Sequence, residues 1–352
     1  MNPRLVITNA AAGSSDDASI EAALGVLRDD GPVRVEATVD AEELGRVLAG
    51  RRDDETVVAI GGDGSLHALV SALHARGELP GVPIGLIPLG TGNDFARTIG
   101  LSDEPDEAAR QLVAAVRTPL DLILDDEDQV TVNAVHIGLG ADAGRLASRW
   151  KRWLGPLGYV VGAIQAGLTA PGLHLRIYVD QERLPHSHGV TMVAMGNGAY
   201  VGAGAELTPD ADPGDGWADV MVSYADAPLA RLGYALRLRR GDHALREDVK
   251  THKVRELAVQ GDQFWVNSDG EVSGPYRERR WRVVPGAVVM MLPGTGGYNQ
   301  PRLTASTPAW KRESTPRSAI RAAIRRRTVR SDTPSARAIC SSIAPPASSA
   351  SS

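Results

Sequence analysis

Two glycine-rich turns carry the residues best suited to hold a phosphate. The first, at residues 61–65, reads Gly-Gly-Asp-Gly-Ser and follows the apolar run 56–60; the second, at residues 88–94, reads Pro-Leu-Gly-Thr-Gly-Asn-Asp and follows the apolar run 84–87. Glycine lets a backbone take positive φ and bring its N–H groups close to an anion, because it has no Cβ. Each turn precedes a helical pattern, whose N-terminus adds partial positive charge. Together the turns predict a nucleotide phosphate site.

The polar residues within these turns add ligands to the predicted site. Asp63 lies between two glycines directly after a strand-like run, so its carboxylate is expected to face whatever the turn binds. Thr91 and Asn93 flank Gly92 and offer a hydroxyl and an amide to phosphate oxygens. Taken singly, the first turn could be a type I′ hairpin, and the second a helix-capping loop with Asn93 or Asp94 as the cap. The helical pattern after the first turn weakens the hairpin interpretation.

Three later segments add glycines and acids. Residues 197–204 place a glycine-rich turn after a strand pattern, and residues 209–220 hold four acids that could bind Mg²⁺ or Ca²⁺, without EF-hand spacing. Asp269-Gly270-Glu271 follows another strand pattern. It reads either as a hairpin turn or as two carboxylates that supply a general base or hold a metal.

Strands and helices must alternate through the first 125 residues to position these turns, which is the pattern of a layered α/β domain. The expected strands are 4–8, 33–38, 57–60 and 84–87, and the expected helices are 16–27, 41–48, 66–75 and 106–116, with Ser15 and Asp40 as N-caps. From about 125 to 292 short β-rich runs predict a mainly antiparallel sheet or sandwich. These runs are 130–137, 173–179, 190–195, 218–224, 254–259, 264–267 and 281–292, with helices at 157–168 and 229–239.

Composition limits the class of protein. The 352 residues, 43% hydrophobic and 23% charged, are enough for two ordinary cores. A single cysteine, Cys340, excludes a disulfide framework or a cysteine zinc site within the chain. The start of the chain has no long apolar signal region, and no run of 18 apolar residues occurs, so a cytoplasmic protein without a membrane span is expected.

Charge separates the last 52 residues from the rest. Residues 301–352 hold ten Lys or Arg and two acids, a net +8, which leaves −13 for the first 300 residues of a chain with formal charge −5. The Ser, Ala, Pro and Arg content predicts disorder there. Residues 317–330 read either as a solvated stretch or as a short basic helix for an anionic membrane surface. Nucleic acid binding is not expected, because the remainder is acidic and lacks interleaved aromatic and basic residues.

In their order along the chain, these segments resemble the diacylglycerol kinase catalytic-domain family, which includes diacylglycerol, sphingosine and ceramide kinases and soluble bacterial lipid kinases. The resemblance covers about residues 3–295. The first turn also occurs in phosphofructokinases and NAD kinases, whereas the string from Pro88 to Ala96 is far more specific.

This resemblance implies a fold of three parts. Residues 1–125 form an ATP-binding α/β domain of the NAD kinase and phosphofructokinase type, residues 126–296 form a mainly antiparallel β-sandwich, and residues 297–352 are a disordered basic tail. ATP and Mg²⁺ are the implied cofactors, bound with the lipid in a cleft between the two domains.

The resemblance also implies roles for individual residues. Glu271 is the implied base that accepts the proton of the lipid hydroxyl, with Asp63 as the alternative base. Asp63 otherwise belongs to the implied cluster of phosphate and metal ligands, and Asp269 is the third implied catalytic acid. A structural Mg²⁺ is implied at the Asp215 carboxylate and the carbonyl groups of Asp212 and Trp217. The implied nucleotide contacts are Asn9, Thr38, Gly61, Gly62, Asp63, Gly64, Ser65, Gly90, Thr91, Gly92 and Asn93.

Several positions depart from the family pattern. Ser65 replaces the commoner threonine and keeps its hydroxyl, and Ala10 replaces a proline. His67, Ala68 and Ser71 replace polar or acidic residues of the helix that follows the first turn, which puts in doubt any contact the family makes from that face. His67 is expected to face solvent or pack, although it could take over such a contact.

Diacylglycerol is the expected acceptor, since the chain has no zinc-finger or additional lipid-binding modules; a sphingoid base, ceramide or another lipid alcohol is the alternative. A soluble-substrate kinase for NAD or a sugar phosphate, and a non-catalytic nucleotide- or lipid-binding protein, are the alternatives from other classes. The acyl chains are expected beside Glu271, against Trp150, Trp153, Leu154, Leu157, Tyr159 and Ile164, unless these form an ordinary core helix. Reversible contact with the inner face of the membrane is expected, and a sheet edge could pair two copies.

Overall fold

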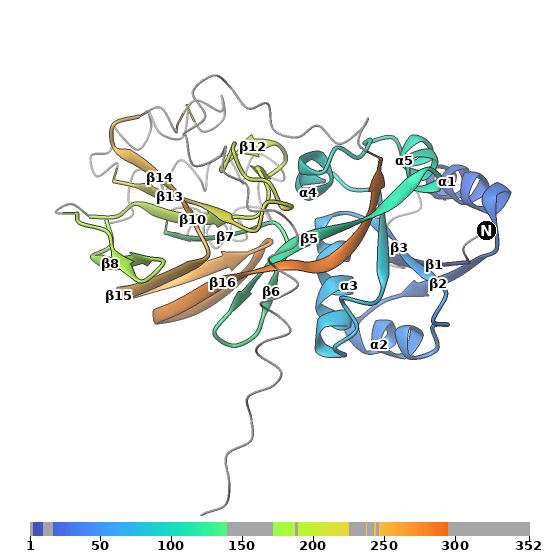
Figure 1. Cartoon of the computed structure of the whole chain (residues 1–352), viewed down its shortest axis with the longest axis horizontal. Coiled ribbons are helices and arrows are strands. Elements are labelled where there is room, and N and C mark those ends of the chain that lie inside the picture. Colours follow the sequence, from blue (N-terminus) through green and yellow to red (C-terminus); the bar gives the residue numbers. More distant parts are fainter. Residues whose placement is uncertain are drawn as a thin grey trace, which may run out of the picture. The chain divides into compact units, whose positions relative to one another are not determined.

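The computed structural model describes residues 3–9, 17–138, 172–186, 189–224, 237, 243 and 246–294. Strands and helices alternate through the first part of the chain (Figure 1). These elements are β1 (Arg4–Asn9), α1 (Asp17–Asp30), β2 (Val33–Thr38), α2 (Ala41–Ala49), β3 (Thr56–Gly61), α3 (Asp63–Ala75), β4 (Pro83–Pro88), α4 (Asp94–Thr98) and α5 (Pro105–Val113).

The four strands β1 to β4 pair in parallel in the order β2-β1-β3-β4. Strands β3 and β4 are buried along their whole length, as their short runs of apolar residues require. Helices α1 and α5 cover one face of the sheet, and α2 and α3 cover the other. The predicted layered α/β domain is therefore confirmed, with helices on both faces of the sheet.

Most predicted boundaries in this part lie within three residues of the observed ones. The Asp40 carboxylate caps α2 by accepting a hydrogen bond of 2.8 Å from the Glu43 N–H, as predicted. The helix predicted over 106–116 ends at Val113 instead, because residues 115–125 form an eleven-residue strand, β5, that the sequence analysis missed. Helix α4 was also missed. Ser15 lies outside the described residues.

The rest of the described chain is β-rich and mostly antiparallel. Its strands are β5 (Ala115–Asp125), β6 (Val130–Thr131), β7 (Ala134–Gly138), β8 (Leu175–Val179), β9 (Glu182–Arg183), β10 (Met192–Gly196), β11 (Tyr200–Val201), β12 (Ala205–Glu206), β13 (Ala218–Ser223), β14 (Val249–Val254), β15 (Glu256–Ser268) and β16 (Glu271–Pro293). A second core, from Ile123 to Val283, packs among them.

Strand β16 joins the two halves into one sheet. It pairs antiparallel with β15 and β5 and parallel with β4, so that the described residues build a 14-stranded sheet. Strands β15 and β16 form the long hairpin drawn in orange in Figure 1. One end of β16 therefore lies beside the parallel strands, and the other carries Glu271.

Three β-strand predictions need correction. The strand predicted over 130–137 is two strands, separated by a turn at residues 132 and 133. The runs 254–259 and 264–267 are largely one strand, β15, which is irregular between Gln260 and Phe264. Residue 254 instead ends β14.

Several predictions concern residues outside the described part of the chain. The helix expected at 157–168, the lipid-lining residues Trp150 to Ile164 and the tail 297–352 lie outside the described residues, as does the helix expected at 229–239 except for Arg237. Within the described part, no helix is long and apolar enough to cross a membrane.

Candidate active site

The residues predicted to bind the nucleotide gather at the carboxyl ends of the parallel strands. Asn9 ends β1 opposite Thr38, the last residue of β2, and Gly61 ends β3 opposite Pro88, the last residue of β4. Ligands of open parallel sheets bind at this edge. The structure thus brings Asn9, Thr38 and both glycine-rich turns to one edge, whereas contact with a nucleotide stays a prediction.

The two glycine-rich turns lie directly against each other. A Cβ on Gly90 would lie 3.1 Å from the Cα of Gly62 and 3.0 Å from the Asn93 Oδ1, and a Cβ on Gly61 would lie 2.3 Å from the Ser65 Oγ. The expectation that these glycines take positive φ is wrong, since only Asn93 does so in the two turns, at 50°. Glycine is needed here because the backbones approach closely.

Asp63 connects the two turns through its carboxylate. It accepts hydrogen bonds of 3.0 and 3.1 Å from the N–H groups of Asp94 and Phe95, and so caps α4 from the first residue of α3. Burial raises the pKa of Asp63; the two N–H donors lower it, and the negative charges of Asp94 and Asp269 raise it again. Asp63 is therefore a site acid with a clear positioning role.

Asp94 ties the third glycine-rich segment to the second turn. Its buried carboxylate accepts hydrogen bonds of 2.7 Å from the Gly204 N–H and 3.0 Å from the Ala203 N–H. The Thr98 hydroxyl accepts a further bond of 3.0 Å from the Ala199 N–H. Here the backbone does take positive φ, at 69° for Ala203 and 102° for Gly204, which points both N–H groups at one carboxylate.

Asn93 uses its amide within the turn. The side-chain NH₂ donates a hydrogen bond of 3.0 Å to the Gly90 carbonyl, and the side-chain oxygen is buried without a hydrogen-bond partner in the part of the chain that the structure describes. An amide oxygen only accepts hydrogen bonds. In this orientation one N–H of the Asn93 amide shapes the turn, and a contact of Asn93 with a phosphate oxygen stays a prediction.

Asp269 and Gly270 form the turn of the β15–β16 hairpin, with φ of 49° and 96°. The Asp269 carboxylate accepts hydrogen bonds from the backbone N–H groups of Val132, Asn133 and Ala134, at 2.6, 2.9 and 3.0 Å. Its fourth partner is the Nδ1 of His67, at 2.9 Å, and only 2% of its side chain is exposed. With four partners, this carboxylate is placed to position the hairpin.

Glu271 differs from Asp269 in its surroundings. It is the first residue of β16 and is exposed, and it forms no ion pair with any residue that the structure describes. A carboxylate in this state is available to accept a proton from a bound hydroxyl. Its predicted role as the base stays a prediction.

His67 is not the solvent-facing or packing histidine that was expected. Besides the Asp269 contact, its Nε2 lies 3.4 Å from the Ser71 hydroxyl one helical turn away. The hydrogen bond to Asp269 raises the pKa of His67; burial opposes this, and the charges of Asp269 and Glu271 add to it. The signal was present in the sequence, since His67 and Ser71 depart from the family pattern at helical spacing.

The acidic side chains of the loop predicted to hold a structural Mg²⁺ have protein partners. One Asp215 oxygen lies 2.6 Å from the Lys253 Nζ, and the other accepts a hydrogen bond of 3.0 Å from the Trp217 N–H. Asp212 accepts one of 2.9 Å from the Gly214 N–H. The described residues contain no group of three or more His, Cys, Asp or Glu placed to hold a metal. The Asp215 oxygen that faces the loop's strand neighbour is already paired with the Lys253 ammonium, and binding of Mg²⁺ by Asp215, Asp212 and Trp217 stays a prediction.

Asp121 on β5 contacts the same loop and was missed by the sequence analysis. Its carboxylate accepts hydrogen bonds of 2.6 Å from the Gly216 N–H and 2.8 Å from the Gly286 N–H. Burial raises the pKa of Asp121 to about 6, although the two N–H donors lower it.

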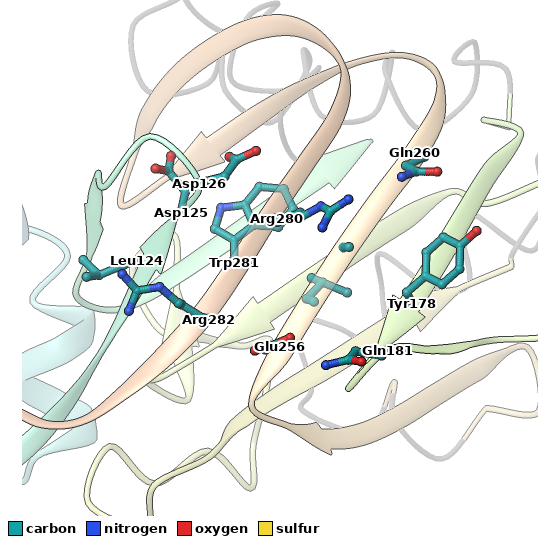
Figure 2. Close-up of a pocket in the computed structure, with 12 residues that line it drawn as sticks. Leu124, Asp125, Asp126, Tyr178, Gln181, Glu256, Gln260, Arg280, Trp281 and Arg282 are labelled. Atoms are coloured by element: carbon teal, nitrogen blue, oxygen red, sulfur yellow. The ribbon is translucent and has the colours of Figure 1, made fainter. Parts of the chain in front are cut away.

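A pocket of about 410 Å³ lies on a different part of the sheet, over the neighbouring strands β5, β16, β15 and β8 (Figure 2). Trp281 and Arg280 line it together with Tyr178 and Glu256. None of the residues predicted for nucleotide, base or metal lines this pocket.

Comparison with known proteins matches both halves of the chain. Residues 3–124 match the diacylglycerol kinase catalytic domain, and residues 133–292 match the YegS C-terminal NAD kinase beta sandwich-like domain.

Similar full-length proteins are found among bacteria. A probable lipid kinase YegS-like protein of Stenotrophomonas maltophilia is 30% identical over 311 residues, covering 82% of this chain and 96% of the relative. One from Xanthomonas euvesicatoria is 30% identical over 295 residues, covering 80% and 94%. Among solved structures, a diacylglycerol kinase from Bacillus anthracis superimposes with a TM-score of 0.65 at 22% identity, covering 83% of this chain and 97% of that chain.

Proposed function

The chain belongs to the YegS-like lipid kinases, which carry a diacylglycerol kinase catalytic domain, and from this premise we propose that it transfers the γ-phosphate of ATP to the hydroxyl of diacylglycerol, giving phosphatidate. The family supports lipid kinase activity with ATP, without naming the lipid acceptor. Diacylglycerol as acceptor is supported by the resemblance of the motifs and by the name of the similar Bacillus anthracis protein. A sphingoid base, ceramide or another lipid alcohol is the alternative.

One observation carries the proposal: the hairpin that bears Glu271 is attached to the helix that begins at the phosphate turn. Asp269, two residues before Glu271, contacts His67 on α3, and α3 starts at Asp63. Residues four apart on a helix lie on the same face. The candidate base Glu271 and the phosphate turn at Asp63 are therefore held near each other by the contact between His67 and Asp269.

The N-terminus of α3 is suited to the phosphates of ATP. Asp63 and Gly64 open the helix, so their N–H groups lie outside its hydrogen-bond ladder and are free to donate to an anion. The second turn packs on the first at Gly62 and keeps this surface in place. Mg²⁺ enters with ATP and, when bound, neutralises charge on the β- and γ-phosphates.

Glu271 orients the attacking hydroxyl and accepts its proton in this proposal. Phosphoryl transfer passes through a loose transition state, so alignment of the acceptor matters more than the strength of the base. Asp269 keeps the hairpin aligned through its hydrogen bonds with the backbone N–H groups of residues 132–134. Asp269 then acts as a positioning residue, and Glu271 as the catalytic one.

The test is transfer of ³²P from labelled ATP, with Mg²⁺, to mixed micelles of diacylglycerol, sphingosine, ceramide or monoacylglycerol. We expect label in phosphatidate, a loss of about 10²–10⁴-fold in kcat for Glu271→Gln, and no loss for Glu256→Gln. Glu256 is a matched control, since it too is exposed at the first residue of a strand. Label in a different lipid would replace the acceptor, and no label in any lipid would overturn the kinase proposal.

A lipid acceptor also requires access to a membrane surface. We propose reversible contact with the inner face of the membrane and a cytoplasmic location. The basic residues of 301–352, with a net charge of +8, would add attraction to anionic lipid. Pairing of two copies through a sheet edge is a further proposal, which the mass of the protein in solution tests directly.

A further inference from the structure

The acidic loop before β13 surrounds a buried ammonium group. The Nζ of Lys253 lies 2.6 Å from an Asp215 oxygen and 2.9 Å from an Asp219 oxygen, and only 5% of the lysine side chain is exposed. A buried charge is tolerated when opposite charges and hydrogen bonds surround it.

Strand pairing places the lysine next to the loop. Lys253 on β14 lies directly opposite Asp219 on β13 in the antiparallel register, and directly opposite residues have side chains on one face. Asp215 comes four residues before Asp219, in the loop itself. One Asp215 oxygen accepts the Trp217 N–H, and the other oxygen faces the Lys253 ammonium.

The loop is also held from its other side without a metal. Asp121 on β5 accepts the Gly216 N–H, and the Asp121 N–H donates to the Pro213 carbonyl at 2.6 Å. The Arg255 guanidinium lies 4.4 Å from the centre of the Trp217 ring, which adds a second positive charge beside the loop. Protein groups therefore contact the loop from β5, β14 and the residue after β14.

We propose that the Lys253 ammonium is the cation of the acidic loop, so that loop order does not require a divalent metal and a neutral residue at 253 opens a cation site at Asp215 and Asp219. The carboxylate pair left by such a change has the hard oxygen ligands that Mg²⁺, Ca²⁺ and lanthanides prefer. The inference concerns the loop alone and does not depend on the lipid that the protein phosphorylates.

Terbium luminescence tests the proposal, because Trp217 lies in the loop and can transfer excitation energy to a Tb³⁺ ion bound there. Wild-type protein is expected to show no tryptophan-sensitised emission from the loop, and Lys253→Met to show saturable emission that Ca²⁺ competes away. The chain has six tryptophans, so adding Trp217→Phe to Lys253→Met must remove the emission. Lys250→Met is the matched control, since Lys250 is exposed on the same strand.

Thermal unfolding gives the second readout. EDTA and Mg²⁺ should give the same Tm for wild type, whereas Lys253→Met should melt lower by roughly 6–20 °C in EDTA and recover part of this with Mg²⁺.

Three results would overturn the proposal. The first is a wild-type Tm that rises with Mg²⁺ alone. The second is wild-type Tb³⁺ emission that Trp217→Phe abolishes. The third is a folded Lys253→Met protein with neither emission nor rescue. If Lys253→Met does not fold, the two wild-type measurements still decide.

Discussion

Replacing Asp269 by asparagine tests the attachment of the Glu271 hairpin. The change removes one of two carboxylate oxygens that together accept three backbone N–H bonds and one from His67. Asparagine tolerates the left-handed φ of 49° at this position, so the backbone adds little strain. The effect therefore comes from hydrogen bonding.

The cost can be worked out from these partners. One amide oxygen can replace the Asp269 Oδ1, which accepts from Asn133 and Ala134, while the new NH₂ faces the Val132 N–H and His67. A neutral His67 can accept from that NH₂, but the Val132 N–H loses its acceptor, at about 1–3 kcal/mol. With the weaker bonds to an uncharged acceptor, Asp269→Asn should cost about 2–4 kcal/mol of unfolding free energy. Asp269→Ala leaves all three N–H groups unpaired and should cost about 3–9 kcal/mol.

Urea unfolding and lipid kinase kinetics measure the two consequences. Asp269→Asn should lower kcat by about 10–100-fold, since a misplaced Glu271 loses alignment with the acceptor, and should leave the KM for ATP nearly unchanged. Glu271→Gln is the control, because an exposed residue should change stability by less than about 0.5 kcal/mol. The reasoning is refuted if Asp269→Asn unfolds within about 0.5 kcal/mol of wild type, or if it is destabilised yet retains full kcat.

Three further predictions concern pH, packing and the tail. The Asp269 contact raises the pKa of His67, so the charged pair stabilises the fold fully below the ordinary histidine pKa of about 6.5, and this stabilisation is lost as pH rises through the raised pKa. In urea unfolding, the difference in unfolding free energy between wild type and His67→Gln should therefore be larger at pH 6 than at pH 9. An equal difference at both pH values contradicts the prediction. Gly90→Ala should cost about 1–3 kcal/mol by thermal unfolding, because its Cβ meets Gly62 and Asn93, whereas Gly45→Ala, with open space, should not destabilise; equal Tm values would refute the packing argument. Deleting residues 301–352, which carry a net charge of +8, should weaken binding to anionic vesicles but not to neutral ones, and equal binding would dismiss the role of the tail.

The sequence by itself determined the parallel strands, the helices between them and the position of the phosphate turns. These features depend on short-range chemistry: runs of β-branched residues, glycine-rich turns directly after those runs, and an Asp40 cap three residues from its partner. The two turns could be assigned to one site because parallel strands end at the same edge of a sheet.

Only the tertiary structure decided which side chains meet at that site. His67 and Asp269 are 202 residues apart, and β5 is a strand because β16, more than 150 residues later, pairs with it. Lys253 likewise reaches Asp215 through strand register, where a metal had been expected. Local sequence sets the preferences of each segment, but partners far along the chain are chosen by the packing and register of the whole sheet, which no local pattern encodes.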